Sequence, residues 1–110
     1  MPLSEKARIE VYLPDLPEVA YEQLVTTFDR EFCHAFGGAT ILRDVRGGYL
    51  NREGQLVHDR INLIYTDTPF TLRDHFDQIA RYADKLRSAV LNALHEEAAL
   101  VVVIPVYHAT

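Results

Sequence analysis

The sequence predicts an α+β domain of the ferredoxin-like class, with elements in the order β-α-β-β-α-β. Three observations predict it. A strand with one apolar face is followed by an amphipathic helix, two strands joined by a tight turn come next, and a long helix leads to an apolar last strand. Right-handed crossovers would place both helices on one face of a four-stranded antiparallel sheet. We expect residues 1–110 to form this single domain.

The first strand is predicted over residues 8–13, and the helix that follows it is predicted to end at residue 36. Positions 8–13 alternate, with the odd-numbered residues apolar and the even-numbered ones, beginning with Arg8, polar. Asp15 and Glu18 are spaced as a helix start, and Gly37 suits the left-handed residue that ends a helix. The apolar face of this helix comprises Tyr21, Leu24, Val25, Phe28, Phe32 and Phe36.

Two strands of a hairpin are predicted over residues 39–51 and 55–66. Asn51–Gly54 supplies the turn, in which Gly54 suits a positive φ. Gly47–Gly48, inside the first of these strands, predicts a β-bulge. Alternation divides the second strand into two faces: one with Val57, Ile61, Leu63 and Tyr65, the other with His58, Arg60, Asn62 and Ile64.

The segment 71–96 is predicted as the long helix because it lacks glycine and proline and repeats apolar residues at steps of three and four. Thr71 and Asp74 have the spacing of a capping box at its start. The stripe comprises Leu72, Phe76, Ile79, Ala83, Leu86, Val90 and Ala93 or Leu94.

The last strand, 98–108, is apolar on both faces, and Pro105 predicts that it lies at a sheet edge because proline cannot donate a ladder hydrogen bond. Such an edge strand would expose a hydrophobic patch to water. We therefore predict a homodimer that packs sheet against sheet or last strand against last strand. The alternative is that the N-terminal tail or the overhanging end of the long helix covers the patch.

The helices leave one sheet face open, and we expect the candidate ligand-binding residues to lie on it. They come from the first and third strands, which are neighbours at the centre of the sheet, and they are Glu10, Tyr12, His58, Arg60 and Asn62. Facing pairs across a ladder lie ~5 Å apart. An acid, a phenol, an imidazole and a guanidinium at that spacing could transfer protons or hold a small anionic ligand. The same groups could instead form a polar network that satisfies its own members.

Composition limits the classes of partner. The net charge of −5, without a run of basic residues, argues against nucleic acid, although ferredoxin-like sheets can stack bases. The longest apolar run is too short to span a bilayer and no signal peptide is visible, so we expect no membrane partner. Cys33 is the only cysteine and the five histidines lack metal-binding spacing. We therefore expect no metal, no cofactor and a cytoplasmic location.

These observations predict a small homodimeric protein that binds a ligand or another protein and assembles through its sheet. The alternative is a small cofactor-independent enzyme of the isomerase or oxygenase type, in which Glu10, Tyr12, His58 and Arg60 form an acid–base cluster. The fold class is compatible with both, because many functions share it. No sequence pattern identifies a catalytic residue.

Overall fold

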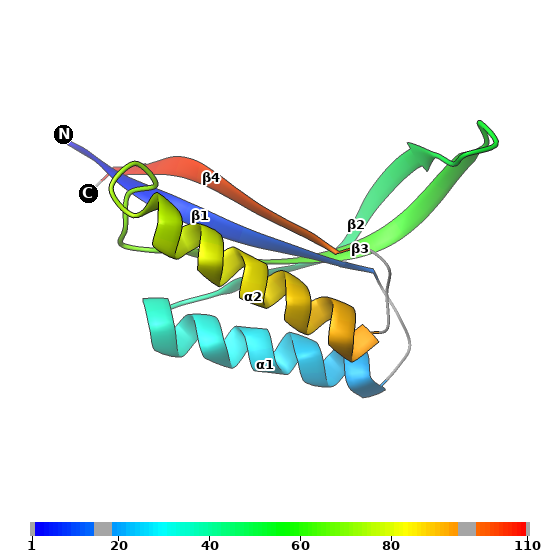
Figure 1. The fold of residues 1–110 in the computed structure, drawn as a ribbon, viewed down its shortest axis with the longest axis horizontal. Helices are drawn as coiled ribbons and strands as arrows, with labels where there is room; N and C mark the ends of the chain where they lie inside the picture. The colour runs from blue at the N-terminus through cyan, green and yellow to red at the C-terminus, as the bar shows by residue number, and fades with distance from the viewer. Residues whose placement is uncertain (1, 15–18, 95–98, 110) are drawn as a thin grey trace.

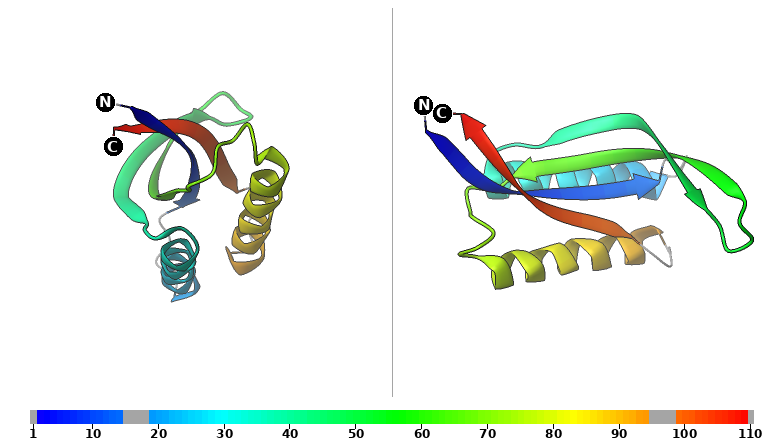
Figure 2. Two further views of the ribbon diagram at one scale, coloured as in Figure 1. Left: turned by 90° about the vertical axis from the view of Figure 1, so that its left-hand side faces the viewer. Right: turned by 90° about the horizontal axis from the view of Figure 1, so that it is seen from above.

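The computed structural model describes residues 2–14, 19–94 and 99–109. Its elements are β1 (Leu3–Pro14), α1 (Val19–Phe36), β2 (Thr40–Leu50), β3 (Leu56–Asp67), α2 (Phe76–Leu94) and β4 (Leu100–Ala109). The strands form one antiparallel sheet in the order β2-β3-β1-β4, and both helices cover the same face (Figures 1 and 2). The predicted ferredoxin-like class is confirmed, and β4 lies at an edge as predicted. Neither of the described helices is long and apolar enough to cross a membrane.

The core lies between the sheet and the two helices. In β1, the odd-numbered Ile9, Val11 and Leu13 are at most 1% exposed, which confirms the predicted alternation. The helices contribute their predicted stripes, and the buried members are Tyr21, Leu24, Val25, Phe28 and Phe32 of α1 and Ile79, Leu86, Val90 and Leu94 of α2. Each large aliphatic or aromatic side chain buried in this way contributes about 1.5–3 kcal/mol. Phe76, predicted in the stripe, is instead exposed at the first residue of α2.

Gly37 ends α1 as predicted, whereas α2 begins at Phe76 and not at Thr71, where its start was predicted. Gly37 has a φ of 90°, and its amide donates to Cys33 O at 3.0 Å, as a left-handed cap does. Before α2, the Asp74 amide donates to Thr71 Oγ1 at 3.3 Å, and Thr71 Oγ1 donates to Asp74 Oδ2 at 3.0 Å. The start of α1 predicted from residues 15–18 lies outside the described residues.

The β-bulge lies in β2 at Arg43 and Asp44, which together oppose Asn62 of β3. Asp44 has a φ of 60°, in the left-handed region that Asp enters more readily than most residues. The bulge predicted at Gly47–Gly48 is therefore wrong in position, because both glycines keep a regular register with β3. Gly47 serves close packing, since a Cβ there would lie 2.9 Å from Cδ1 of Ile61.

Residues 45–60 form an arm, the β2–β3 ribbon, that projects beyond the rest of the sheet (Figure 1). β1 pairs with β3 only as far as Ile61, so these residues have no third strand beside them. The predicted turn closes the ribbon: Gly54 has a φ of 77°, and its amide donates to Asn51 O at 3.0 Å. Tyr49 and Leu50 are more than half exposed on it. Two strands alone are marginally stable in water, so this arm gains from a partner.

Candidate functional site on the open face of the sheet

The register of β1 with β3 decides which side chains reach the open face. Val11 pairs with Ile64 and Leu13 pairs with Asn62, and residues paired across an antiparallel ladder project to the same side. Because Val11 and Leu13 face the helices, the even-numbered residues of β3 do so too. Ile64 is fully buried and Asn62 is only 2% exposed. The open face therefore carries the odd-numbered residues of β3.

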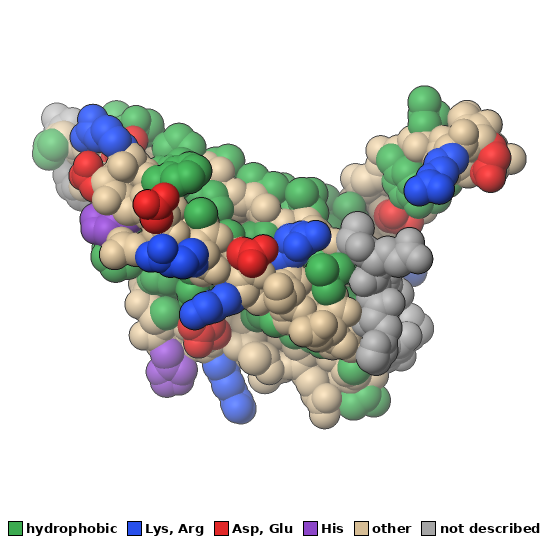
Figure 3. All heavy atoms as spheres, viewed as in Figure 1, with side chains coloured by type: hydrophobic (Ala, Val, Ile, Leu, Met, Phe, Trp, Pro, Cys, Tyr) green, Lys and Arg blue, Asp and Glu red, His purple; other side chains and the backbone are tan. Residues whose placement is uncertain are grey.

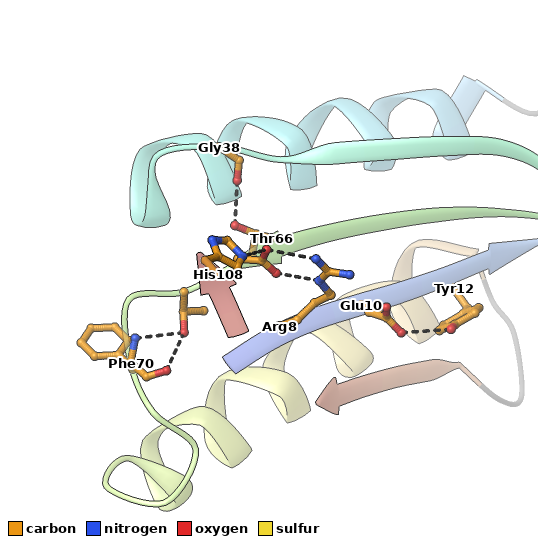
Figure 4. A network of polar contacts seen from close by, with 9 residues as sticks. Arg8, Glu10, Tyr12, Gly38, Thr66, Phe70 and His108 are labelled. Carbon is orange, nitrogen blue, oxygen red and sulfur yellow. Dashed lines mark hydrogen bonds and ion pairs between the residues drawn. The ribbon is translucent and has the colours of Figure 1, made fainter. Parts of the chain in front are cut away.

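The predicted cluster of five residues does not assemble. Glu10 and Tyr12 lie on the open face as predicted, where Tyr12 Oη donates to Glu10 Oε1 at 3.0 Å (Figure 4). Asn62 faces the core, and His58 and Arg60 lie on the ribbon beyond the end of β1. The prediction that the three β3 residues share a face with Glu10 is wrong by one residue of register, which turns every side chain of a strand to the other side. The acid–base cluster postulated for an enzyme is lost with it.

Buried polar residues explain the error. Asn62 Oδ1 accepts the amide of the bulge residue Asp44 at 3.2 Å, and its Nδ2 donates to Tyr21 Oη. Thr66 Oγ1 donates to Gly38 O at 2.7 Å (Figure 4). These bonds make polar side chains acceptable on the buried face. A rule that treats every polar residue as exposed therefore assigns the buried and the open face of β3 the wrong way round.

A polar cluster that the sequence did not predict occupies the open face near the ends of the chain. We call Arg8, Tyr65, Asp67 and His108 the Asp67 cluster. Arg8 is bidentate to Asp67, with Nε 2.7 Å from Oδ1 and Nη2 3.1 Å from Oδ2, and His108 Nε2 lies 2.7 Å from Oδ2 (Figure 4). The Arg8 guanidinium also lies over the Tyr65 ring, 4.2 Å from its centroid. Three strands contribute, so only their register reveals the group.

The electrostatics favour a satisfied network over a reactive site. Hydrogen bonding from Arg8 is the largest effect on Asp67 and lowers its pKa, with His108 adding to it. The same bond raises the pKa of Arg8. A carboxylate held in this way is a poor proton acceptor, and a guanidinium already occupied by a carboxylate has little left for a ligand. Burial followed by the bond to Glu10 raises the pKa of Tyr12, which keeps the phenol protonated.

The rest of the open face is largely apolar. In β4, four side chains face this side through pairing with even-numbered residues of β1; this apolar row is Leu100, Val102, Ile104 and Val106. Leu100 is 54% exposed and the other three are half-buried. Val101 and Val103 pack against the core, so β4 is apolar on both faces, as predicted. Residues 3–14 form β1 and the described part of α2 lies on the other face, so neither covers the row (Figure 2).

His58 and Arg60 take part in a second grouping, on the ribbon. With Arg46 and Asp59 they line a hollow of about 350 Å³. Arg46 lies directly opposite Arg60 in the ladder, and Arg60 Nη1 is 3.6 Å from Asp44 Oδ1. Two guanidinium groups therefore meet at this hollow, where Asp59 and the ion pair of Arg60 with Asp44 offset their charge. Over the described ranges, no three His, Cys, Asp or Glu side chains are grouped so as to hold a metal.

Comparison with known proteins gives likeness in structure alone. No family model matches the sequence, and no curated protein matches it. Among solved structures, CutA1 from Oryza sativa aligns over 98% of this chain and 85% of its own, with a TM-score of 0.54 and 14% identity. The divalent cation tolerance protein CutA1 from Thermus thermophilus aligns over 96% and 87%, with a TM-score of 0.55 and 15% identity. The chain shares the fold of these proteins. At this identity the likeness carries the β-α-β-β-α-β architecture and leaves function to the site itself.

Proposed function

We propose that the protein is a homodimeric binding and assembly module that associates through the open face of its sheet. The observation that carries this proposal is the apolar row of β4 on the open face, in which Leu100 is 54% exposed and the other three side chains are half-buried. Apolar surface that stays accessible in one continuous row is typical of an interaction site. The exposed apolar side chains of the β2–β3 ribbon extend the same argument, and the ribbon stands clear of the body in Figure 3.

A second copy of the chain is the occupant that the charges favour. Across the open face, Arg8 is neutralised by Asp67, and Glu10 accepts from Tyr12, all within one copy. The Arg8–Asp67 pair can therefore be brought against another sheet with its charges paired, while Glu10 keeps one hydrogen-bond donor in Tyr12. A two-fold contact also requires a surface complementary to itself, and an apolar row flanked by internally paired charges meets that requirement.

Sedimentation at micromolar concentration tests this assembly. We expect the protein to sediment as a dimer, and Ile104→Glu, which places a charge in the apolar row, to sediment as a monomer. The new carboxylate would face Arg8 across the ladder, so the fold should tolerate it. Val19→Glu is the matched control, because Val19 is 76% exposed at the start of α1. A monomeric unmodified protein, or a dimeric Ile104→Glu variant, would contradict association through the sheet face.

A small anion is the ligand that the ribbon favours. Arg46 faces Arg60 beside His58, and an anion bound there would accept a charge-assisted hydrogen bond from Arg46 while Arg60 keeps its ion pair with Asp44. Of the five predicted ligand-binding residues, this proposal retains His58 and Arg60. It places them in a site separate from Glu10 and Tyr12. A cytoplasmic location, and the absence of nucleic-acid and membrane partners, stay predictions from composition.

Titration with inorganic phosphate tests the ribbon site. Arg46→Gln should weaken phosphate binding by about tenfold, since one charge-assisted hydrogen bond contributes about 1.5–3 kcal/mol and the site is partly solvated. Arg52→Gln, in the exposed hairpin loop, removes the same charge from the protein and should change binding less than twofold. Equal losses in the two variants would mean that phosphate responds to net charge, and the site would be abandoned.

A further inference from the structure

One side of the β2–β3 ribbon changes from charged to apolar between the body of the sheet and the tip. The cross-strand pairs along it, in that order, are Arg46 with Arg60, Gly48 with His58, and Leu50 with Leu56. Successive pairs on one side of a ladder lie about 7 Å apart. Leu50 and Leu56 are 69% and 63% exposed, so their surface is available to a ligand. The even-numbered residues of β3 face away from the open side, so this side of the ribbon is separate from the proposed dimer contact.

At the charged end, two opposite charges line one hollow without forming an ion pair with each other. Arg46 and Asp59 both line the hollow of about 350 Å³, and neither has an ion-pair partner among the described residues. Arg60, in contrast, is held by Asp44, with Nη1 3.6 Å from Oδ1. His58 completes the lining, and its ring nitrogens can donate or accept according to the tautomer. One molecule that carries both an acid and an amino group could therefore bridge Arg46 and Asp59.

We infer that this site binds a free α-amino acid with a large apolar side chain, an inference that rests on the anion site proposed at Arg46. The ligand carboxylate would accept from Arg46, and the ammonium would donate to Asp59. The apolar side chain would extend toward the tip and cover Leu50 and Leu56, which removes apolar surface from water. Such a ligand has no net charge, which suits an end where two guanidinium groups meet the carboxylates of Asp44 and Asp59. The amino acid is free because a peptide bond would remove one of its two charged groups.

Phenylalanine and hydrocinnamate test the role of the ammonium, because they share the ring and the carboxylate and differ by the amino group. Binding is followed on the full chain at neutral pH by amide chemical shifts. Phenylalanine should shift the amides of residues 45–60 and bind about tenfold more tightly, the factor expected for one charge-assisted hydrogen bond at a partly solvated site. Asp59→Asn should reduce this preference to about twofold or less. Glu53→Gln, which removes an exposed carboxylate from the turn of the same ribbon, should leave it intact.

Phenylalanine and glycine test the apolar end, because they share both charged groups and differ by the side chain. Phenylalanine should bind about tenfold more tightly than glycine, and Leu56→Ser should reduce this ratio to about threefold or less. Tyr49→Ser is the matched control, since Tyr49 is 52% exposed and pairs with Val57 on the other side of the ribbon, and it should leave the ratio unchanged. All of these positions except Val57 are exposed, so the variants should fold.

Inorganic phosphate separates this inference from the anion site beneath it, because phosphate has neither an ammonium nor an apolar group. If phosphate binds but phenylalanine binds no better than hydrocinnamate, or no better than glycine, the amino acid is rejected and the anion site stands. Shifts confined to residues outside the ribbon would also overturn the inference. Failure of phosphate to bind the unmodified protein would reject the anion site and the amino acid site together.

Discussion

Replacing Asn62 with alanine should lower the free energy of unfolding by about 2–4 kcal/mol. The Asn62 side chain is 2% exposed, accepts the amide of Asp44 through Oδ1 and donates to the fully buried Tyr21 hydroxyl through Nδ2. Alanine removes both bonds and leaves a cavity at the centre of the helix-facing surface of the sheet. Because the Asp44 amide belongs to the β-bulge, the variant should also loosen the start of the β2–β3 ribbon. Chemical denaturation measures the first effect, and amide exchange of residues 43–50 measures the second.

Asn92→Ala is the matched control for this prediction. Asn92 is exposed on α2, where alanine is the better helix former, so its stability should stay within about 0.5 kcal/mol of the unmodified protein. Tyr21→Phe removes the other partner of the buried bond, and a double-mutant cycle with Asn62→Ala should give a coupling of about 1 kcal/mol. An Asn62→Ala variant as stable as Asn92→Ala would show that the bulge holds without the buried amide.

The helices and β1 could be predicted because most of their residues follow one rule, although α2 begins at Phe76 and not at residue 71. In β1, residues 8–13 alternate apolar and polar, and the structure buries the apolar set. In α1, the stripe that ends at Phe36 and the positive-φ Gly37 agree on where the helix stops. When spacing, burial and capping all indicate the same structure, sequence alone suffices to place an element.

β3 could not be placed from its sequence because both of its faces are mixed. The set with Ile61 and Leu63 is the more apolar, yet it faces the open side, whereas the set with Asn62 and Thr66 faces the core. A buried apolar partner for the open side would make this arrangement favourable, which agrees with the proposed dimer. The bulge was misplaced for a related reason: Asp44 supplies the positive φ for which a glycine was expected.

The Asp67 cluster is a tertiary feature and could be anticipated only from the strand register. Arg8 was placed correctly on the open face, but its partner depends on which β3 residue pairs with it. That register places Asp67 opposite, while His108 arrives from β4, 41 residues further along the chain. Only once β3 is turned by one residue does Arg8 find its carboxylate partner, Asp67, within one copy.

Asp67→Asn should lower the free energy of unfolding at neutral pH by about 1–3 kcal/mol, because it leaves the Arg8 guanidinium, only 26% exposed, without its carboxylate. The loss should depend on pH. The folded state lowers the pKa of Asp67, chiefly through the bond from Arg8, so the carboxylate stabilises the fold fully above its unfolded pKa of about 3.9 and loses that contribution as the pH falls through the folded pKa. Unfolding measured from pH 7 to pH 2 should therefore show the unmodified protein and Asp67→Asn converging below about pH 4.

Asp84→Asn is the control. The Asp84 side chain is 74% exposed and lies 3.9 Å from Arg87, and an exposed ion pair of this kind contributes little to the free energy of unfolding. If the free energies of unfolding of the unmodified protein and of Asp67→Asn differ by the same amount at every pH, then protonation of Asp67 is not what destabilises the fold in acid.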